Sequence, residues 1–270
     1  MNTKTYWHST IIGIGLLMVS WGVQAQGIVG SQHDLTATGS GQSTTAVTDQ
    51  VCVFCHTPHG SDTTAAVPLW NKTLPDPATY QRYSELQTAT FDSLEAPVGS
   101  VSLACLSCHD GSQAMDVVLN APGTGMGSGR IDPTMLAMTG TPVPMLGTDL
   151  RDDHPISMQY GGGGATNLDA DGTFAGTLGD PDFTFPEKAT INSVPMWWVD
   201  SPVGAAATRE KTDMLLYTGA AVGGSGASEP FVECGSCHDP HNSATGGPAQ
   251  VSFLRINQTA SQICTTCHIK

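Results

Sequence analysis

All eight cysteines of this sequence fall into one short pattern that occurs four times. In each copy two residues separate the cysteines, and a histidine directly follows the second cysteine. The copies are Cys52-Val53-Phe54-Cys55-His56, Cys105-Leu106-Ser107-Cys108-His109, Cys234-Gly235-Ser236-Cys237-His238 and Cys264-Thr265-Thr266-Cys267-His268. This spacing is typical of c-type haem attachment, in which the two thiols form thioethers with the haem vinyl groups and the histidine ligates the iron. The sequence therefore predicts four haem c groups, each with a motif histidine as proximal iron ligand.

Three other uses of these cysteines were weighed: structural disulfides, zinc sites and redox-active dithiols. None of them explains why a histidine follows the second cysteine in all four copies. An oxidising export compartment also disfavours a reduced dithiol, and a zinc site does not need this fixed histidine. The haem interpretation is therefore favoured over the other three together.

Four histidines outside the motifs could supply the second axial ligand of each iron. They are His33, His59, His154 and His241, whereas the ninth histidine, His8, lies near the N-terminus. Their number matches the four remaining axial positions, so we expect bis-histidine, low-spin haems with no position open for a substrate. Two alternatives stay open: a histidine of this set can be a surface or structural residue, and methionine can serve as a sixth ligand.

Two of these spare histidines closely follow a motif histidine. His59 stands three residues after His56, and His241 stands three residues after His238. Three residues cannot reach round the porphyrin to the opposite face of the same iron. Each is therefore expected to ligate the partner haem of its pair, in the second motif for His59 and in the fourth motif for His241. The other two spare histidines then remain for the irons of the first and third motifs.

The surrounding sequence predicts short elements to position these residues. Aromatic residues make up 6% and charged residues 13% of the chain, and glycine is frequent, so long amphipathic helices are not expected. We expect a short helical turn at each motif, because both thioethers and the iron ligand must face one porphyrin. Elsewhere we expect mostly coil with few short strands, so that four covalently bound haems act as the core.

Two further segments carry structural expectations. Thr208 to Tyr217 is the best candidate for an additional helix, with Thr208 as its N-cap. Trp197 and Trp198 are expected to pack on a haem or at an interface.

Residues 1–25 are predicted to form a secretory signal peptide. Lys4 gives a weakly basic start, and the apolar stretch from Ile11 to Val23 precedes a small-residue cleavage site that ends at Ala25. This apolar run is too short to span a membrane comfortably. We therefore expect an exported protein with no membrane insertion after cleavage. Its predicted location is extracellular or at the cell surface, with the periplasm as the alternative.

Residues 26–270 are expected to form a single tetrahaem domain with two pseudo-repeat halves, about 26–120 and 150–270. Each half supplies two motifs and two spare histidines. A cysteine-free insertion at 110–233 separates the halves, and its glycines predict turns. One stretch of it, "LDADGTFAG", resembles part of a calcium loop but lacks the terminal glutamate and the flanking helices, so we expect a turn there.

The chain resembles the multihaem c-type cytochromes with doubled C-x-x-C-H motifs, a group near the cytochrome c3 type. The resemblance is carried by the blocks "GSQHDL", "CVFCHTPHG", "VPLWN", "YQRYSEL", "CLSCHDGSQAMD", "DDHPISMQY", "VECGSCHDPHNS" and "FLRINQTASQICTTCHIK". Within this group the chain is most similar to extracellular tetrahaem cytochromes that polymerise into nanowire filaments. That resemblance implies closely packed haems and a sixth ligand donated by the next subunit, for which His33 is the best-matching position. The long insertion before Cys234 departs from the short c3-like pattern.

The expected function is electron transfer by a secreted tetrahaem cytochrome that is a subunit of a conductive extracellular filament, not an enzyme. Its expected partners are copies of itself placed end to end, together with redox donors and acceptors. The formal net charge of −14 speaks against nucleic acid or anionic membranes as partners. Two alternatives are a monomeric periplasmic electron shuttle and a terminal reductase with an open-coordination haem.

Overall fold

The structure of the protein is a computed structural model. It describes residues 27–89, 91, 93–123, 129–140, 145–164, 177–219, 222, 229–242 and 253–269. The predicted signal peptide at 1–25 and the calcium-loop-like segment at 168–176 lie outside these described residues. Among the helices that the structure describes, none is long and apolar enough to cross a membrane.

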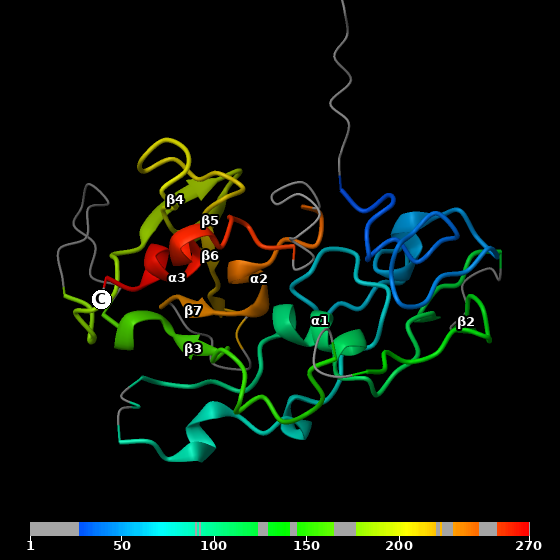
Figure 1. The fold of residues 1–270 in the computed structure, drawn as a ribbon, viewed down its shortest axis with the longest axis horizontal. Coiled ribbons are helices and arrows are strands. Elements are labelled where there is room, and N and C mark those ends of the chain that lie inside the picture. The colour runs from blue at the N-terminus through cyan, green and yellow to red at the C-terminus, as the bar shows by residue number, and fades with distance from the viewer. Residues whose placement is uncertain are drawn as a thin grey trace, which may run out of the picture.

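A short helical segment lies at each of the four motifs, as the spacing predicts (Figure 1). The first motif occupies a 3-10 turn, η1 (Val51–Phe54), and the second lies in the last turns of α1 (Ser100–His109). The third and fourth motifs form α2 (Cys234–Cys237) and α3 (Gln262–Cys267). In the first, third and fourth motifs the histidine N–H donates to the carbonyl of the first cysteine at 2.8 to 3.0 Å. Because residues three and four apart share one face of a helical turn, this backbone turns the thiols and the imidazole to one side.

The strands are short and all pair antiparallel. β1 (Val117–Val118) pairs with β2 (Gly129–Arg130), and β3 (Met158–Gln159) pairs with β7 (Phe231–Val232). A three-stranded sheet has the order β4 (Glu187–Ile191), β5 (Val194–Val199) and β6 (Met214–Leu216). Further 3-10 turns are η2 (Pro77–Thr79), η3 (Tyr83–Leu86), η4 (Tyr160–Gly162) and η7 (Thr259–Ser261). The remaining described chain is mostly coil, which confirms the predicted coil-rich class.

The prediction of a helix from Thr208 to Tyr217 is wrong. The segment makes a turn, in which the Glu210 N–H donates to Asp213 Oδ2 at 2.5 Å, and then enters strand β6. The three consecutive apolar residues of β6 are all buried and pair with Val199, Trp198 and Trp197 of β5. A strand enclosed on both faces carries a continuous apolar run, and such a run can be mistaken for the end of a helix.

Two apolar clusters form the larger part of the side-chain core, and each contacts cysteines from two motifs. The first cluster contacts Cys55 and Cys108 and consists of Leu35, Phe54, Met115, Val118, Ala121, Ile131, Met135 and Met138. The second contacts Cys237 and Cys267 and consists of Tyr160, Leu178, Trp197, Val199, Met214, Leu216 and Ile256. The motifs therefore border the core: the second cysteine of each motif is partly buried and packs against a cluster, whereas Cys52 and Cys264 are exposed.

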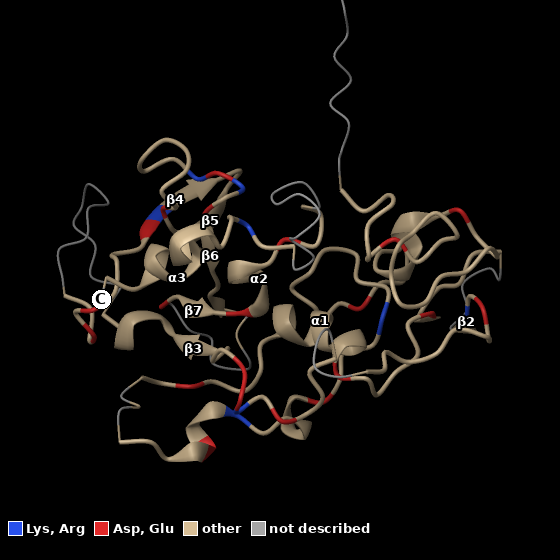
Figure 2. Ribbon diagram, viewed as in Figure 1, with Lys and Arg blue, Asp and Glu red and all other residues tan. Residues whose placement is uncertain are grey.

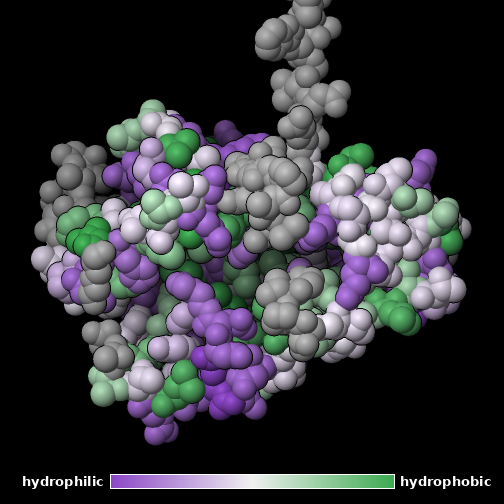
Figure 3. All heavy atoms as spheres, viewed as in Figure 1, coloured by the Kyte–Doolittle hydropathy of each residue, from purple (hydrophilic) through white to green (hydrophobic). Residues whose placement is uncertain are grey.

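The order of these parts along the molecule can be followed in Figure 1. The N-terminal residues, drawn in blue, and β2 lie at one end, the β4–β5–β6 sheet and α3 lie at the other, and α1 and α2 lie between them. Apolar atoms line the recessed middle of the face shown in Figure 3. Acidic side chains are spread along the loops of the whole molecule, whereas Lys and Arg are few (Figure 2).

Candidate multihaem site

The first motif is held by residues that follow it closely in the sequence. His56 Nδ1 lies 2.8 Å from the carbonyl oxygen of Pro68, and the Trp70 ring meets the imidazole edge-on with ring centroids 6.0 Å apart. The Asn71 N–H donates to the Cys55 carbonyl at 2.8 Å. A histidine that ligates a metal usually donates its other ring N–H to a carbonyl or carboxylate. The arrangement therefore leaves His56 Nε2 for an iron.

The four motifs are neighbours in space in the order in which they occur in the sequence. Thiols of consecutive motifs lie close enough to interact, and the pairs are Cys55 with Cys108, Cys105 with Cys234, and Cys237 with Cys267. The hydrogen bond between Cys105 and Cys234 lies where α1 contacts α2. A cofactor attached to any motif would therefore lie next to the cofactor of the following motif.

Burial and hydrogen bonding shift the pKa values of most of the motif thiols upward. Burial raises the pKa of Cys55 and of Cys267 to about 12, and that of Cys237 to about 11. The hydrogen bond with Cys234, followed by burial, raises the pKa of Cys105. All eight cysteines lie in the described part of the chain, and none forms a disulfide. The hydrogen bond between Cys105 and Cys234 lowers the pKa of Cys234. Because zinc sites and redox dithiols need thiolates, the raised pKa values disfavour both alternatives at Cys55, Cys105, Cys237 and Cys267 only.

Two motif histidines each face one of the spare histidines. The ring centroids of His56 and His241 are 6.0 Å apart with planes inclined by 22°, and those of His33 and His109 are 6.1 Å apart with planes at 88°. Two metal–imidazole bonds of about 2 Å each, plus the distance from each nitrogen to its ring centre, would place the centroids about 6 Å apart. Both centroid separations are therefore close to the value for two imidazoles on one iron.

His33 has the surroundings of a metal ligand. Its Nδ1 is buried and has no hydrogen-bond partner within the described residues, while the backbone of Pro240 hydrogen-bonds the ring. Phe253 stacks on the imidazole with centroids 4.1 Å apart. Burial, followed by the nearby His109, lowers the pKa of His33 to about 4, which keeps the ring neutral. A neutral imidazole with one nitrogen tied to a carbonyl and the other unpartnered fits iron ligation.

Exposure does not separate the two remaining spare histidines from the paired His241, whose side chain is itself 60% exposed. His59 and His154 are both exposed, and neither ring contacts a motif histidine within the described part. His154 Nδ1 lies 3.1 Å from the carbonyl oxygen of Pro155. His268 of the fourth motif packs against the Phe183 ring, with centroids 4.4 Å apart. The structure thus brings two of the four spare histidines to motif histidines and leaves the other two outside such pairs.

The comparison with protein families adds an independent observation. Residues 229–270 match the model of the doubled CXXCH motif. The matched segment contains the third and fourth motifs together with His241. No curated protein sequence matched the chain. The match supports a multihaem c-type cytochrome with covalently bound haem c, and hence electron transport as the type of function and an exported location.

Sequence reasoning missed several residues that support the doubled CXXCH motifs. The carbonyl oxygens of Pro68 and Pro240 that orient His56 and His33 carry no signal in residue type, because any residue has a carbonyl. Phe253 could have been noticed, since an aromatic residue shortly before the fourth motif suits packing on an imidazole or a porphyrin.

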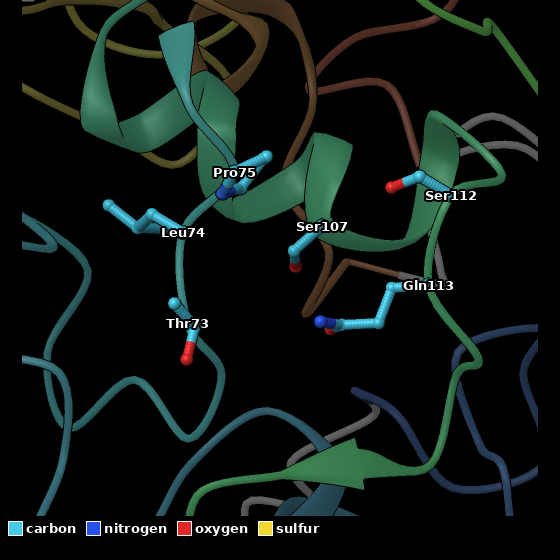
Figure 4. A pocket seen from close by; sticks show the side chains of 6 residues that line it. All are labelled: Thr73, Leu74, Pro75, Ser107, Ser112 and Gln113. Atoms are coloured by element: carbon cyan, nitrogen blue, oxygen red, sulfur yellow. The ribbon is translucent and has the colours of Figure 1, made fainter. Parts of the chain in front are cut away.

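A small pocket lies beside the second motif, but it does not suit a haem. It has a volume of about 140 Å³ and lies between the segment at 73–75 and the end of α1 (Figure 4). Its lining residues are Thr73, Leu74, Pro75, Ser107, Ser112 and Gln113. Pockets for ligands of ordinary size begin at about 300 Å³, so this pocket is too small to hold a porphyrin.

Proposed function

We propose that the protein is a tetrahaem c-type cytochrome that transfers electrons along four haems arranged in the order of their motifs. Bound haem supplies one-electron iron chemistry, and the chain attaches it, ligates its iron and fixes the spacing between neighbouring groups. The observation that carries this proposal is the pair of histidine contacts, because each joins a motif histidine to a spare one at a separation suited to one iron. The consecutive thiol contacts support the linear order.

The ring positions favour an axial pairing that differs from the one predicted from spacing. We propose His241 as the distal ligand of the His56 iron and His33 as the distal ligand of the His109 iron. His59 and His154 are then assigned to the two remaining irons, those of His238 and His268. In this assignment the third motif supplies a ligand to the first, so the two halves of the chain share a haem site.

Bis-histidine ligation favours an electron carrier over an enzyme. When two imidazoles occupy both axial positions, a substrate cannot reach the metal without displacing a ligand. A terminal reductase would need an open axial position at one of the four irons. A monomeric periplasmic shuttle would share the ligation and differ only in its assembly.

The proposal extends to a secreted filament subunit, and this part rests on the resemblance to nanowire cytochromes. The resemblance points to His33 as the ligand donated across the junction. Its contact with His109 of the same chain favours an internal role instead. At a junction, exposed His59 or His154 would then ligate the His238 or His268 iron of the next subunit instead of the one in its own chain. In either version, copies of the chain are joined end to end.

The first experiment measures haem content and ligation in the exported protein. We expect an intact mass that corresponds to four attached haems, low-spin signals alone in electron paramagnetic resonance, and no binding of carbon monoxide. Fewer attached haems would contradict the tetrahaem proposal. A high-spin signal together with carbon monoxide binding would instead favour the reductase. Negative-stain microscopy and native mass of the same preparation separate filament from monomeric shuttle.

The two roles of His33 are separated by His33→Ala in protein kept monomeric. If His33 ligates the His109 iron of its own chain, the variant monomer gains one high-spin haem relative to the wild-type monomer. If His33 acts only at a junction, the monomeric spectra are identical and only filament assembly is lost. The matched control is Gln32→Ala, which changes the exposed neighbour of His33 and none of the assigned ligands.

A further inference from the structure

A lysine side chain lies buried between the first two motifs. Lys72 is 1% exposed, and its Nζ donates to the carbonyl oxygens of Met115 at 2.8 Å and Val117 at 2.7 Å. The N–H of the preceding residue, Asn71, donates to the Cys55 carbonyl at 2.8 Å, and Met115 belongs to the first cluster, which both Cys55 and Cys108 contact. The ammonium group therefore lies close to the attachment points of two consecutive haems.

No acidic partner offsets this charge directly. Within the described residues, no carboxylate is in ion-pair contact with Lys72. The nearest acidic residue in sequence to its carbonyl partners is Asp116, which is fully buried and accepts hydrogen bonds from Arg130 at 2.6 and 2.9 Å. Asp116 is thus paired with Arg130 and makes no ion-pair contact with Lys72. Burial of a cation that only backbone carbonyls stabilise lowers the stability of the folded protein. A function of this charge at the neighbouring haem sites would account for its position.

The second half of the chain contains a counterpart. Arg255 is 6% exposed, and its guanidinium donates to the carbonyl oxygens of Gly235 at 3.0 Å and Lys211 at 3.1 Å. Its backbone N–H donates to the Cys237 carbonyl at 2.8 Å, so the residue is fixed to the third motif at two points. Each half thus holds one buried cation on backbone carbonyls beside its motif cysteines.

The charge of a haem changes by one when it accepts an electron. Iron(III) becomes iron(II), no bond forms or breaks, and the site becomes more negative by one unit. A fixed cation nearby favours that added negative charge, and the effect is larger at a buried site because the local dielectric is low. We infer that Lys72 and Arg255 raise the reduction potentials of the haems attached beside them, an inference that rests on the proposed tetrahaem function.

The experiment is a spectroscopic redox titration of the intact haem-loaded protein, with a chemical reductant as electron source. Lys72→Gln removes the charge but keeps an amide that can donate to the same carbonyls. We expect part of the haem absorbance to titrate at a lower potential in this variant, and the wild-type curve to return in Lys72→Arg. Lys188→Gln is the control, because it removes an exposed cation that lies 4.5 Å from the centroid of the Trp197 ring.

Arg255→Gln is the independent second variant, and it tests the same inference if Lys72→Gln fails to attach four haems. Four attached haems with a titration curve superimposable on that of the wild type would overturn the inference for the residue changed. Such a result would leave the tetrahaem function intact. Failure of the wild-type protein itself to attach four haems would instead contradict the proposed function.

Discussion

Glu233 is a buried carboxyl group at the contact between α1, α2 and β3. It is 1% exposed and accepts hydrogen bonds from the hydroxyl groups of Ser102 and Ser157, the latter at 3.2 Å. It also caps α2, since its side chain accepts from the Ser236 N–H. Burial outweighs these hydrogen bonds and raises the pKa of Glu233 to about 8. The carboxyl therefore holds its proton in the folded protein at a pH where the unfolded chain has released it.

This pKa shift predicts a stability that depends on pH. The unfolded carboxyl ionises near 4.5 and the folded one near 8, so the free energy of unfolding should fall as pH rises between these values. The loss at pH 8 is on the order of 4 kcal/mol. Glu233→Gln, which stays neutral, should flatten this dependence in denaturant unfolding of the haem-loaded protein, whereas the exposed Glu85→Gln should keep it. An unchanged slope in Glu233→Gln would show that another group carries the effect.

Residue types predicted the attachment chemistry but not the axial partners. Covalent attachment fixes the positions of both cysteines and the proximal histidine within five residues, so a local pattern is sufficient to find them. The contact of His241 with His56 joins positions far apart in the chain, and no local spacing encodes it. The spacing assigns His241 to a haem other than that of its own motif, and this stays a prediction, whereas the contact with His56 depends on how the third motif packs against the first.

Among the elements, the motif turns were predictable and the three-stranded sheet was not. The turn between β4 and β5 uses Asn192 and Ser193, with φ of 50° and 66°. Two successive left-handed residues suit a two-residue hairpin, but the sequence lacks the Asn-Gly pair that usually signals one. In β6, burial on both faces removed the alternation that marks a strand. Neither the β4–β5 turn nor strand β6 could be predicted, because in both places tertiary packing determines the backbone conformation and the local sequence pattern does not.

The Asn71 side chain connects the first motif to the loop that contains Asn120. Asn71 is fully buried, and its side chain donates to the carbonyls of Val53 and Asn120 at 2.7 and 3.1 Å and accepts from the Asn120 N–H at 2.9 Å. Asn71→Ala would leave these backbone groups unpaired in a buried place. We expect a loss of about 2–4 kcal/mol in the free energy of unfolding.

Thermal or denaturant unfolding of the haem-loaded protein measures this loss. The matched control is Asn257→Ala at an exposed position, which should change the free energy of unfolding by less than about 1 kcal/mol. Equal stabilities of the two variants would mean that the Asn71 side chain does not anchor the motif.

At the scale of the whole molecule, the motifs and the side-chain core form one unit. The first cluster encloses thiols of the first two motifs, the second encloses thiols of the last two, and the contact of α1 with α2 links them. The division into halves at about 26–120 and 150–270 stays a prediction. The pairing of β3 with β7 lies within the later half, whereas the contact of His56 with His241 crosses between the halves. Folding of either half alone would therefore leave an axial site incomplete.

The side-chain clusters are small, and we predict that the chain does not fold without attached haem. Each cluster contains only seven or eight buried residues, and both are bordered by cysteines that would carry haem. Replacement of all eight cysteines by alanine removes little side-chain volume but prevents attachment of the four large apolar groups. We expect no cooperative thermal transition by circular dichroism, in contrast to the wild-type protein. The matched control is Cys52→Ala with Cys55→Ala, which should lose one haem and retain a transition at lower temperature. A native-like spectrum with cooperative melting in the eight-alanine variant would show that the side-chain clusters suffice.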